Sequence, residues 1–268
     1  MARSSQVQAA SSASGSRGDR RARKPEEHPY LRFTLITLTL VLLAFAAFEA
    51  AIVLPPAIAH PGVTLGMDFT IYMDRARSWL AGDGFYLPWQ LTGPYVVGTT
   101  GTPPALYPPV LLYLLVPFTV LPAVLWWAIP LGIIAVSSYR LRPAAWTWPI
   151  LAAVLCYPRA WIVLVYGNPS LWIFAALAAG LVWTWPLAFL PLKAPLAPFA
   201  LLGVRQRAFW AGVGTFVLLA LPFGSMWPDY LMAIANARNG YGLEYIVGEL
   251  PIAVALVVAG IGRSTRSA

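Results

Sequence analysis

The chain has 268 residues, of which 59% are hydrophobic and only 10% are charged, and its mean hydropathy is +0.68. A soluble domain carries about a quarter charged residues, so this composition excludes an ordinary soluble enzyme and predicts an all-α, polytopic membrane protein. The net charge of +8 comes from cations at the N-terminus and in short loops, which indicates membrane topology rather than nucleic-acid binding. One cysteine excludes an internal disulfide, and two histidines disfavour a His-rich metal site.

The N-terminal residues 1–30 are rich in Ser, Ala, Gly and Arg, and we expect them to form a disordered, basic, cytosolic tail. Residues 31–268 are expected to form one transmembrane bundle of about eight membrane segments, some of them short or broken. The first apolar run, residues 35–53, is long enough to cross the hydrocarbon core. An external loop rich in Pro, Gly and Thr follows from about residue 55 to 104.

Within this external loop, residues 68–80 are predicted to form an amphipathic helix that lies in the membrane interface. Asp68, Tyr72, Arg75 and Trp79 recur at the i, i+4, i+7, i+11 spacing of one helix face. The sequence Gly-Asp-Gly directly after the helix is a strong stop signal.

The positive-inside rule orders the later segments. Residues 106–121 are predicted to be a re-entrant or interfacial helix, because one crossing between 123 and 139 then leaves Arg140 with the cytoplasmic cations. Residues 185–204 contain four prolines and are predicted to form two half-spans that meet near Lys193. The remaining crossings are predicted at residues 144–165, 170–184, 208–223 and 250–262. A second external loop covers about 224–249. The protein is expected in the plasma membrane, with both termini in the cytoplasm.

Charged groups are costly inside a membrane, so the few ionisable residues near its outer side are candidates for a site. Asp68 opens the stretch MDFTIYM at the outer mouth of the bundle, where a membrane enzyme would keep its base. Lys193 stands between prolines and is either a lysine that reaches the interface or a cation that holds a phosphate. Arg159 is either part of a structural ion pair or a second ligand of that anion. Asn168 precedes Pro169, so it is no glycosylation acceptor, and it begins a helix.

Several short motifs occur in a recognisable order: D-F-x-x-Y at 68–72, W-L-A-G-D-G-F-Y at 79–86, Y-P-P at 107–109, Gly-Asn at 167–168, L-K-A-P at 192–195 and V-R-Q-R-A-F-W at 204–210. Together they resemble the GT-C superfamily of membrane glycosyltransferases. The resemblance is closest to glycosyltransferase family 87, the polyprenyl-phosphate-mannose-dependent mannosyltransferases, and it runs from about residue 35 to 260.

The resemblance implies that a sugar, mannose in that family, moves from a polyprenyl-phosphate donor to a lipid or glycan acceptor on the outer face, in one inverting step. Asp68 matches the acid that acts as general base on the acceptor hydroxyl. The expected substrate-binding residues are Lys193, Arg159 and Arg75 at the phosphate, in that order, Tyr72 and Tyr107 at the sugar, and Asn168. The resemblance implies no obligatory metal cofactor. Binding of a divalent cation between carboxylates is left as an alternative.

Two alternatives of other classes stay open. A catalytically inactive binding or assembly subunit would keep the fold and bind the lipid phosphate without turnover. A small transporter or lipid flippase would also use prolines and intramembrane charges, but it would place charged residues in both halves of the membrane.

Overall fold

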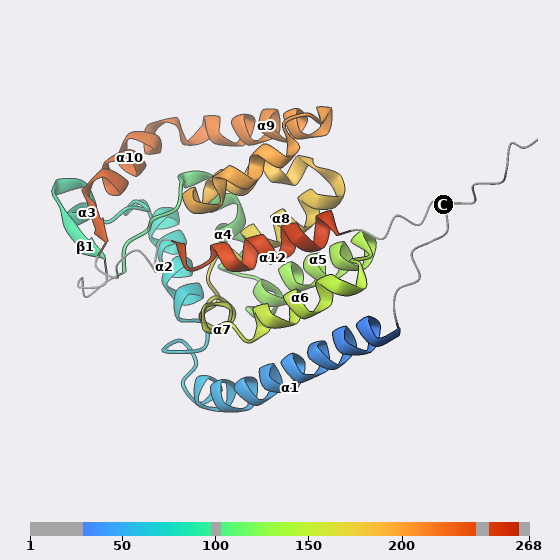
Figure 1. Ribbon diagram of the computed structural model, residues 1–268. Coiled ribbons are helices and arrows are strands. Elements are labelled where there is room, and N and C mark those ends of the chain that lie inside the picture. Colours follow the sequence, from blue (N-terminus) through green and yellow to red (C-terminus); the bar gives the residue numbers. More distant parts are fainter. Residues whose placement is uncertain (1–28, 98–102, 240–246, 263–268) are drawn as a thin grey trace, which may run out of the picture.

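The computed structural model describes residues 29–97, 103–239 and 247–262, so nearly all of the predicted N-terminal tail lies outside the described residues. Within these ranges the chain is mostly helical, which confirms the predicted class (Figure 1). In chain order the elements are α1 (Pro29–Ala59), α2 (Met67–Ala81), α3 (Pro88–Thr92), β1 (Tyr95–Val97), η1 (Pro109–Leu111), α4 (Leu112–Phe118), α5 (Val124–Leu141), η2 (Ala145–Thr147), α6 (Trp148–Leu155), α7 (Pro158–Tyr166), α8 (Ser170–Trp183), η3 (Trp185–Leu192), η4 (Ala194–Gly203), α9 (Arg207–Ala220), η5 (Leu221–Met226), α10 (Trp227–Asn236), β2 (Ala237–Asn239) and α12 (Leu250–Ile261).

Among the described residues, three helical runs are long and apolar enough to cross a membrane, namely α1, α5 and the run Arg207–Asn236. A fourth crossing is available if the pair Ala145–Leu155 and Pro158–Tyr166 counts as one broken span, because the two helices meet at an angle of 65°. The predicted crossing over 144–165 corresponds to this bent pair of helices. The number of about eight segments is not confirmed, since α8 and α12 are apolar but short.

Helix α1 lies along one side of the molecule and packs mainly against α6 (Figure 1). It has 31 residues, which corresponds to about 46 Å. The helix extends past the predicted end at residue 53 and includes Pro55 and Pro56. Large apolar side chains such as Phe33, Phe45 and Phe48 are exposed along it. Such a surface is stable in lipid and would be unstable in water.

The core of the bundle is built around α8, which contacts both α5 and η3. Residues on several sides of α8 are buried, including Ile173, Phe174 and Leu177. Gly180 lets η3 approach closely, because a Cβ atom there would lie 2.4 Å from Leu187 Cδ2. The proline-rich segments η3 and η4 pack on each other, and α9 covers η3.

The break that the sequence predicts near Lys193 is present. Segment η3 ends at Leu192, η4 begins at Ala194, and Lys193 between them has extended φ and ψ of −126° and 107°. The prediction that 106–121 does not cross is consistent with length, because Pro109–Phe118 would span only about 15 Å of a core about 30 Å thick.

The two predicted external loops meet in a small sheet. Strand β1 pairs in parallel with β2, with Tyr95 opposite Ala237, and Asn236 Nδ2 donates to Gln90 O at 2.9 Å. The interpretation of 224–249 as a loop was wrong in its first half, because α10 continues the helical run to Asn236. Residues 240–246 lie outside the described part of the chain.

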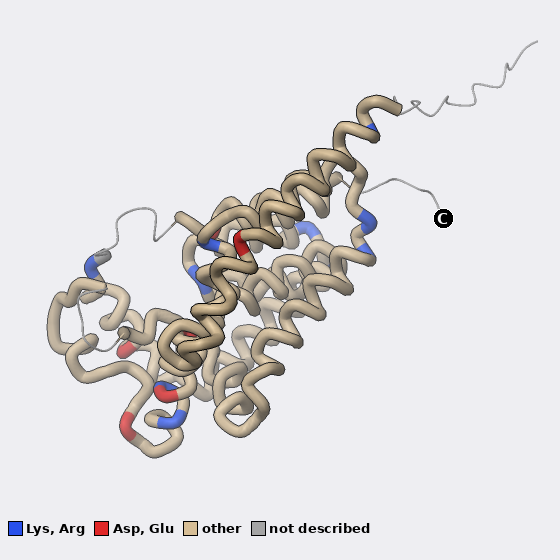
Figure 2. Tube along the Cα trace, turned by 90° about the horizontal axis from the view of Figure 1, so that it is seen from below, with Lys and Arg blue, Asp and Glu red and all other residues tan. Residues whose placement is uncertain are grey.

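Charge is distributed unevenly along the described bundle. Figure 2 shows basic residues without acidic neighbours at the end of the bundle nearest the C-terminus. Acidic residues appear near the middle and at the opposite end, where basic residues lie beside them. The ends of the bundle therefore differ in charge, which is the asymmetry that membrane topology follows.

Candidate functional site

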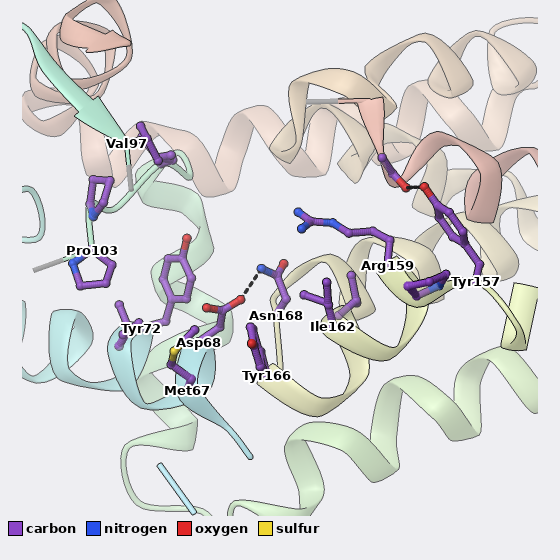
Figure 3. A pocket seen from close by; sticks show the side chains of 16 residues that line it. Met67, Asp68, Tyr72, Val97, Pro103, Tyr157, Arg159, Ile162, Tyr166 and Asn168 are labelled. Carbon is purple, nitrogen blue, oxygen red and sulfur yellow. Dashed lines mark hydrogen bonds between the residues drawn. The ribbon is translucent and has the colours of Figure 1, made fainter. Parts of the chain in front are cut away.

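A cavity of about 580 Å³ lies where the start of α2, helix α7 and the chain near residue 104 come together (Figure 3). Such a volume is in the range of small-ligand sites. Of the seven predicted site residues, four line it: Asp68, Tyr72, Arg159 and Asn168. Most of the remaining lining is apolar or aromatic, including Met67, Ile71, Leu106, Ile162, Val163 and Tyr166.

The start of α2 positions Asp68. Gly66 has a left-handed φ of 77°, and its N–H donates to Val165 O at 2.8 Å, which ties the turn before α2 to helix α7. Asp68 thus lies in the first helical turn, where the helix dipole favours a negative charge. The inner face of α2, with Tyr72, Met73 and Ala76, is buried against the rest of the bundle.

Two tryptophans at the start of α5 position Asn168. Trp126 Nε1 donates to Gly167 O at 2.8 Å, and Trp127 Nε1 donates to Leu164 O at 2.7 Å. Gly167 ends α7 with a left-handed φ of 66°, and a Cβ atom there would lie 2.7 Å from the Trp127 ring. Only glycine fits this position without rearrangement, so Asn168 can approach α2.

Asp68 and Asn168 are joined directly. Asn168 Nδ2 donates to Asp68 Oδ2 at 2.6 Å, as the dashed line in Figure 3 shows. The amide is itself fixed, because Asn168 Oδ1 accepts from the Ser170 N–H at 2.9 Å and from Ser170 Oγ at 2.6 Å. Tyr107 also donates its hydroxyl to this oxygen at 3.2 Å. Within the described part of the chain, the other carboxylate oxygen, Asp68 Oδ1, makes no hydrogen bond.

Burial raises the pKa of Asp68 above its usual value. The hydrogen bond from Asn168 and the charges of Lys193 and Arg159 act in the opposite direction without cancelling this effect, and Glu249 adds to the rise. A carboxylate with a raised pKa is a stronger base than an exposed one.

Beside the cavity lies an ionic group in which buried Glu249 contacts two part-buried cations, Lys193 and Arg159. Lys193 Nζ lies 2.6 Å from Glu249 Oε1, and Arg159 Nη2 lies 3.5 Å from the same oxygen. Lys193 also donates to Ser170 Oγ, which connects this group to Asn168 and Asp68. Lys193 does not line the cavity, whereas Arg159 does.

Tyr107 and Arg75 also lie outside the cavity lining. Tyr107 is buried beneath it, where its ring contacts Tyr72 at a centroid distance of 5.4 Å and lies 5.9 Å from Lys193 Nζ. Burial raises the pKa of Tyr107 well above its usual value, so its hydroxyl stays a neutral donor. Arg75 is half-buried on α2, and within the described residues its side chain makes no hydrogen bond or ion pair.

Two residues of this arrangement were not among the predicted site residues, although Glu249 belongs to the few ionisable residues expected near the outer side. Ser170 is fully buried at the start of α8, and Glu249 is 2% exposed at the start of α12. The signal for Glu249 was an acid directly before an apolar helix, since a carboxylate in that place needs a cation and Lys193 had no partner in the sequence. The described residues contain no cluster of three or more His, Cys, Asp or Glu that could hold a metal ion.

Comparison with known proteins returned no match, whether to a protein-family model, to a curated protein or to a solved structure.

Proposed function

We propose that this chain is an integral-membrane glycosyltransferase that moves a sugar from a polyprenyl-phosphate donor to a lipid or glycan acceptor, with Asp68 as general base. The observation that carries the proposal is the pairing, in one cavity, of a buried carboxylate of raised pKa with a guanidinium group. In Figure 3, Asp68 enters from α2 and Arg159 from α7, with Asn168 between them.

Asp68 has the properties that a base on an acceptor hydroxyl needs. Asn168 fixes one of its oxygens at 2.6 Å, so the other is oriented and available to accept a proton. General bases work best when their pKa lies near the working pH, and burial moves the pKa of Asp68 in that direction.

Arg159 supports the choice of an anionic leaving group. A guanidinium presents a planar fork of N–H donors that matches two phosphate oxygens, and it stays charged at any physiological pH. The sequence ranked Lys193 first for this role, but the geometry favours Arg159, because Arg159 lines the cavity and Lys193 is bound to Ser170 and Glu249.

The proposed step is a single displacement at the anomeric carbon of the donor sugar. The acceptor oxygen forms a bond to this carbon while its proton passes to Asp68 Oδ1. The bond from the anomeric carbon to the phosphate oxygen breaks, and the electron pair leaves with the polyprenyl phosphate, whose negative charge Arg159 stabilises. Attack opposite the leaving group inverts the anomeric configuration.

The proposed location is the plasma membrane, with the cavity on the outer side and both termini in the cytoplasm. The charge asymmetry in Figure 2 supports this orientation, because the purely basic end of the bundle would face the cytoplasm. The cavity is lined by residues away from this basic end, including those at the start of α2.

The test is a transfer assay with membranes that contain either wild type or Asp68→Asn, supplied with radiolabelled polyprenyl-phosphate-mannose and a native lipid extract. We expect label in a new lipid product with wild type only, since removal of a general base typically costs about 10²- to 10⁴-fold in rate. Asp74→Asn is the matched control, because Asp74 is an exposed acid on the same helix and pairs with Arg77.

Sugar transfer by Asp68→Asn at the wild-type rate would show that Asp68 is not the general base. No transfer by wild type with mannose or other donor sugars, together with retained binding of the lipid phosphate, would favour the binding or assembly subunit instead.

A further inference from the structure

Glu249 is a buried carboxylate with two cations on one of its oxygens. Its side chain is 2% exposed, and Oε1 contacts both Lys193 Nζ at 2.6 Å and Arg159 Nη2 at 3.5 Å. The second oxygen, Oε2, is buried and has no hydrogen-bond partner within the described residues. A buried carboxylate in this state remains a strong acceptor for any nearby guanidinium.

The two contacts are unequal. The lysine contact is a short, charge-assisted hydrogen bond, whereas 3.5 Å exceeds the usual length of an N–H···O bond to arginine. An arginine that pairs fully with a carboxylate commonly uses both oxygens in a bidentate arrangement. Of the two Glu249 oxygens, Arg159 lies nearest the one that Lys193 already occupies, so its contact with Glu249 is weak.

Lys193 is held where it is by several groups. Besides Glu249, its ammonium contacts Ser170 Oγ, and it lies 5.9 Å from the centre of the Tyr107 ring. Lys193 is placed there by the break between η3 and η4, whose extended backbone at this residue interrupts the helical path. The ammonium is thus directed to Glu249 and Ser170 by its surroundings, while Arg159 lines the cavity.

We infer that Lys193 is a positioning residue that neutralises Glu249 and thereby weakens the attraction of Glu249 for Arg159, so that Arg159 can bind a phosphate group in the cavity. The identity of the anion as a lipid phosphate rests on the proposed function. Glu249 competes with the ligand for Arg159, and Lys193 suppresses that competition. The sum of formal charges on Asp68, Arg159, Lys193 and Glu249 is zero, and loss of Lys193 alone would make it negative.

This role differs from direct phosphate binding by Lys193 in one measurable way. If Lys193 acts through Glu249, substitution of Glu249 restores the phosphate binding that substitution of Lys193 weakens. If Lys193 itself touches the phosphate, the second substitution restores nothing. A double-mutant cycle separates the two cases.

The experiment measures binding of dodecyl phosphate, a phosphate monoester with a short lipid tail, to the purified full chain in detergent, with dodecanol as the control for the tail. The variants are Lys193→Met, Glu249→Gln and the double variant Lys193→Met/Glu249→Gln. We expect Lys193→Met to bind about tenfold or more weakly, which corresponds to about 1.4 kcal/mol. The double variant is expected to return to within about threefold of wild type, and Glu249→Gln to bind at least as tightly as wild type.

A double variant as weak as Lys193→Met would overturn the inference, and so would weaker binding by Glu249→Gln. If Lys193→Met fails to fold, Glu249→Gln and the double variant still decide, because neither leaves an unpaired buried carboxylate. Equal binding of dodecyl phosphate and dodecanol by wild type would overturn both the inference and the proposal that the donor is a lipid phosphate. If the variants bind as expected but wild type transfers no sugar, the inference holds and the proposed transferase activity is rejected.

Discussion

Asp68 and Asn168, which are 100 positions apart in the chain, are joined by a hydrogen bond of 2.6 Å from the Asn168 amide to Asp68 Oδ2. This contact brings the start of α2 and the turn between α7 and α8 to one cavity. It also orients the carboxylate, because the amide is held in turn by Ser170 and Tyr107. The pair is therefore part of a fixed polar arrangement rather than a surface contact.

Asp68→Asn is expected to preserve or increase thermal stability while it abolishes transfer. Burial in the folded protein raises the pKa of Asp68, so at any pH above this raised pKa the buried charge destabilises the fold. This destabilisation is relieved as the pH falls through the raised pKa. The neutral amide removes it at every pH, and each 1 kcal/mol of relief would raise the melting temperature by about 2–4 °C.

The measurement is the melting temperature of both proteins in the same detergent at pH 7 and at a pH below the acidic limb of activity. The gain from Asp68→Asn should shrink at the lower pH, where Asp68 is already protonated in wild type. A melting temperature that falls by several degrees at both pH values would contradict the account of a strained, functional carboxylate.

The acidic limb of the pH–activity profile is expected to move to higher pH in Asn168→Ala. The hydrogen bond from Asn168 lowers the pKa of Asp68, and burial raises it, so loss of the amide leaves burial less opposed. Since the base must be deprotonated, activity in this variant should begin to fall at a higher pH than in wild type. The profile of kcat/KM against pH measures the shift.

Asn236→Ala is the matched control for this experiment. Asn236 also donates its amide, to Gln90 O at 2.9 Å, but it lies outside the cavity lining. Its acidic limb should coincide with that of wild type. An unchanged limb in Asn168→Ala would show that another group sets the pH dependence.

Much of the candidate site could be predicted because local patterns determine where its parts lie. Asp68 and Tyr72 share one face of a helix at i and i+4, and this spacing follows from helix geometry alone. The break at Lys193 follows from prolines that cannot continue an α-helix. These features depend on neighbours in sequence, which is why the predicted helix over 68–80 and the predicted break at Lys193 are both present.

The contacts between distant segments could not be predicted. Whether Lys193 reaches the cavity or Glu249 depends on how α12 packs beside η4, and nothing local to either residue encodes that. The helix count failed for a related reason. Apolar segments such as α8 are as hydrophobic as a membrane span, but they are buried by neighbouring protein, and composition does not distinguish protein from lipid surroundings.

Gly167→Ala is expected to destabilise the protein by about 1–3 kcal/mol, because a side chain must adopt the left-handed φ of 66° and its Cβ would lie 2.7 Å from the Trp127 ring. The displacement should also separate Asn168 from Asp68 and reduce transfer. Gly214→Ala is the control, since no atom lies within 4 Å of the Cβ it would add on helix α9. The melting temperature should fall for Gly167→Ala and stay unchanged or rise for Gly214→Ala. Equal melting temperatures would contradict the close packing of this turn on Trp127.

Arg159→Gln is expected to raise the KM for the donor by about 10- to 100-fold, because a charge-assisted hydrogen bond typically contributes about 1.5–3 kcal/mol. Glu249 keeps Lys193 as its partner in this variant, at 2.6 Å, so the fold should be retained. Arg159→Lys should fall between Arg159→Gln and wild type, since lysine keeps the charge but lacks the planar fork. Arg77→Gln removes an exposed cation that pairs with Asp74 and should leave the donor KM unchanged. A donor KM unaffected by Arg159→Gln, with the melting temperature preserved, would place the phosphate away from α7.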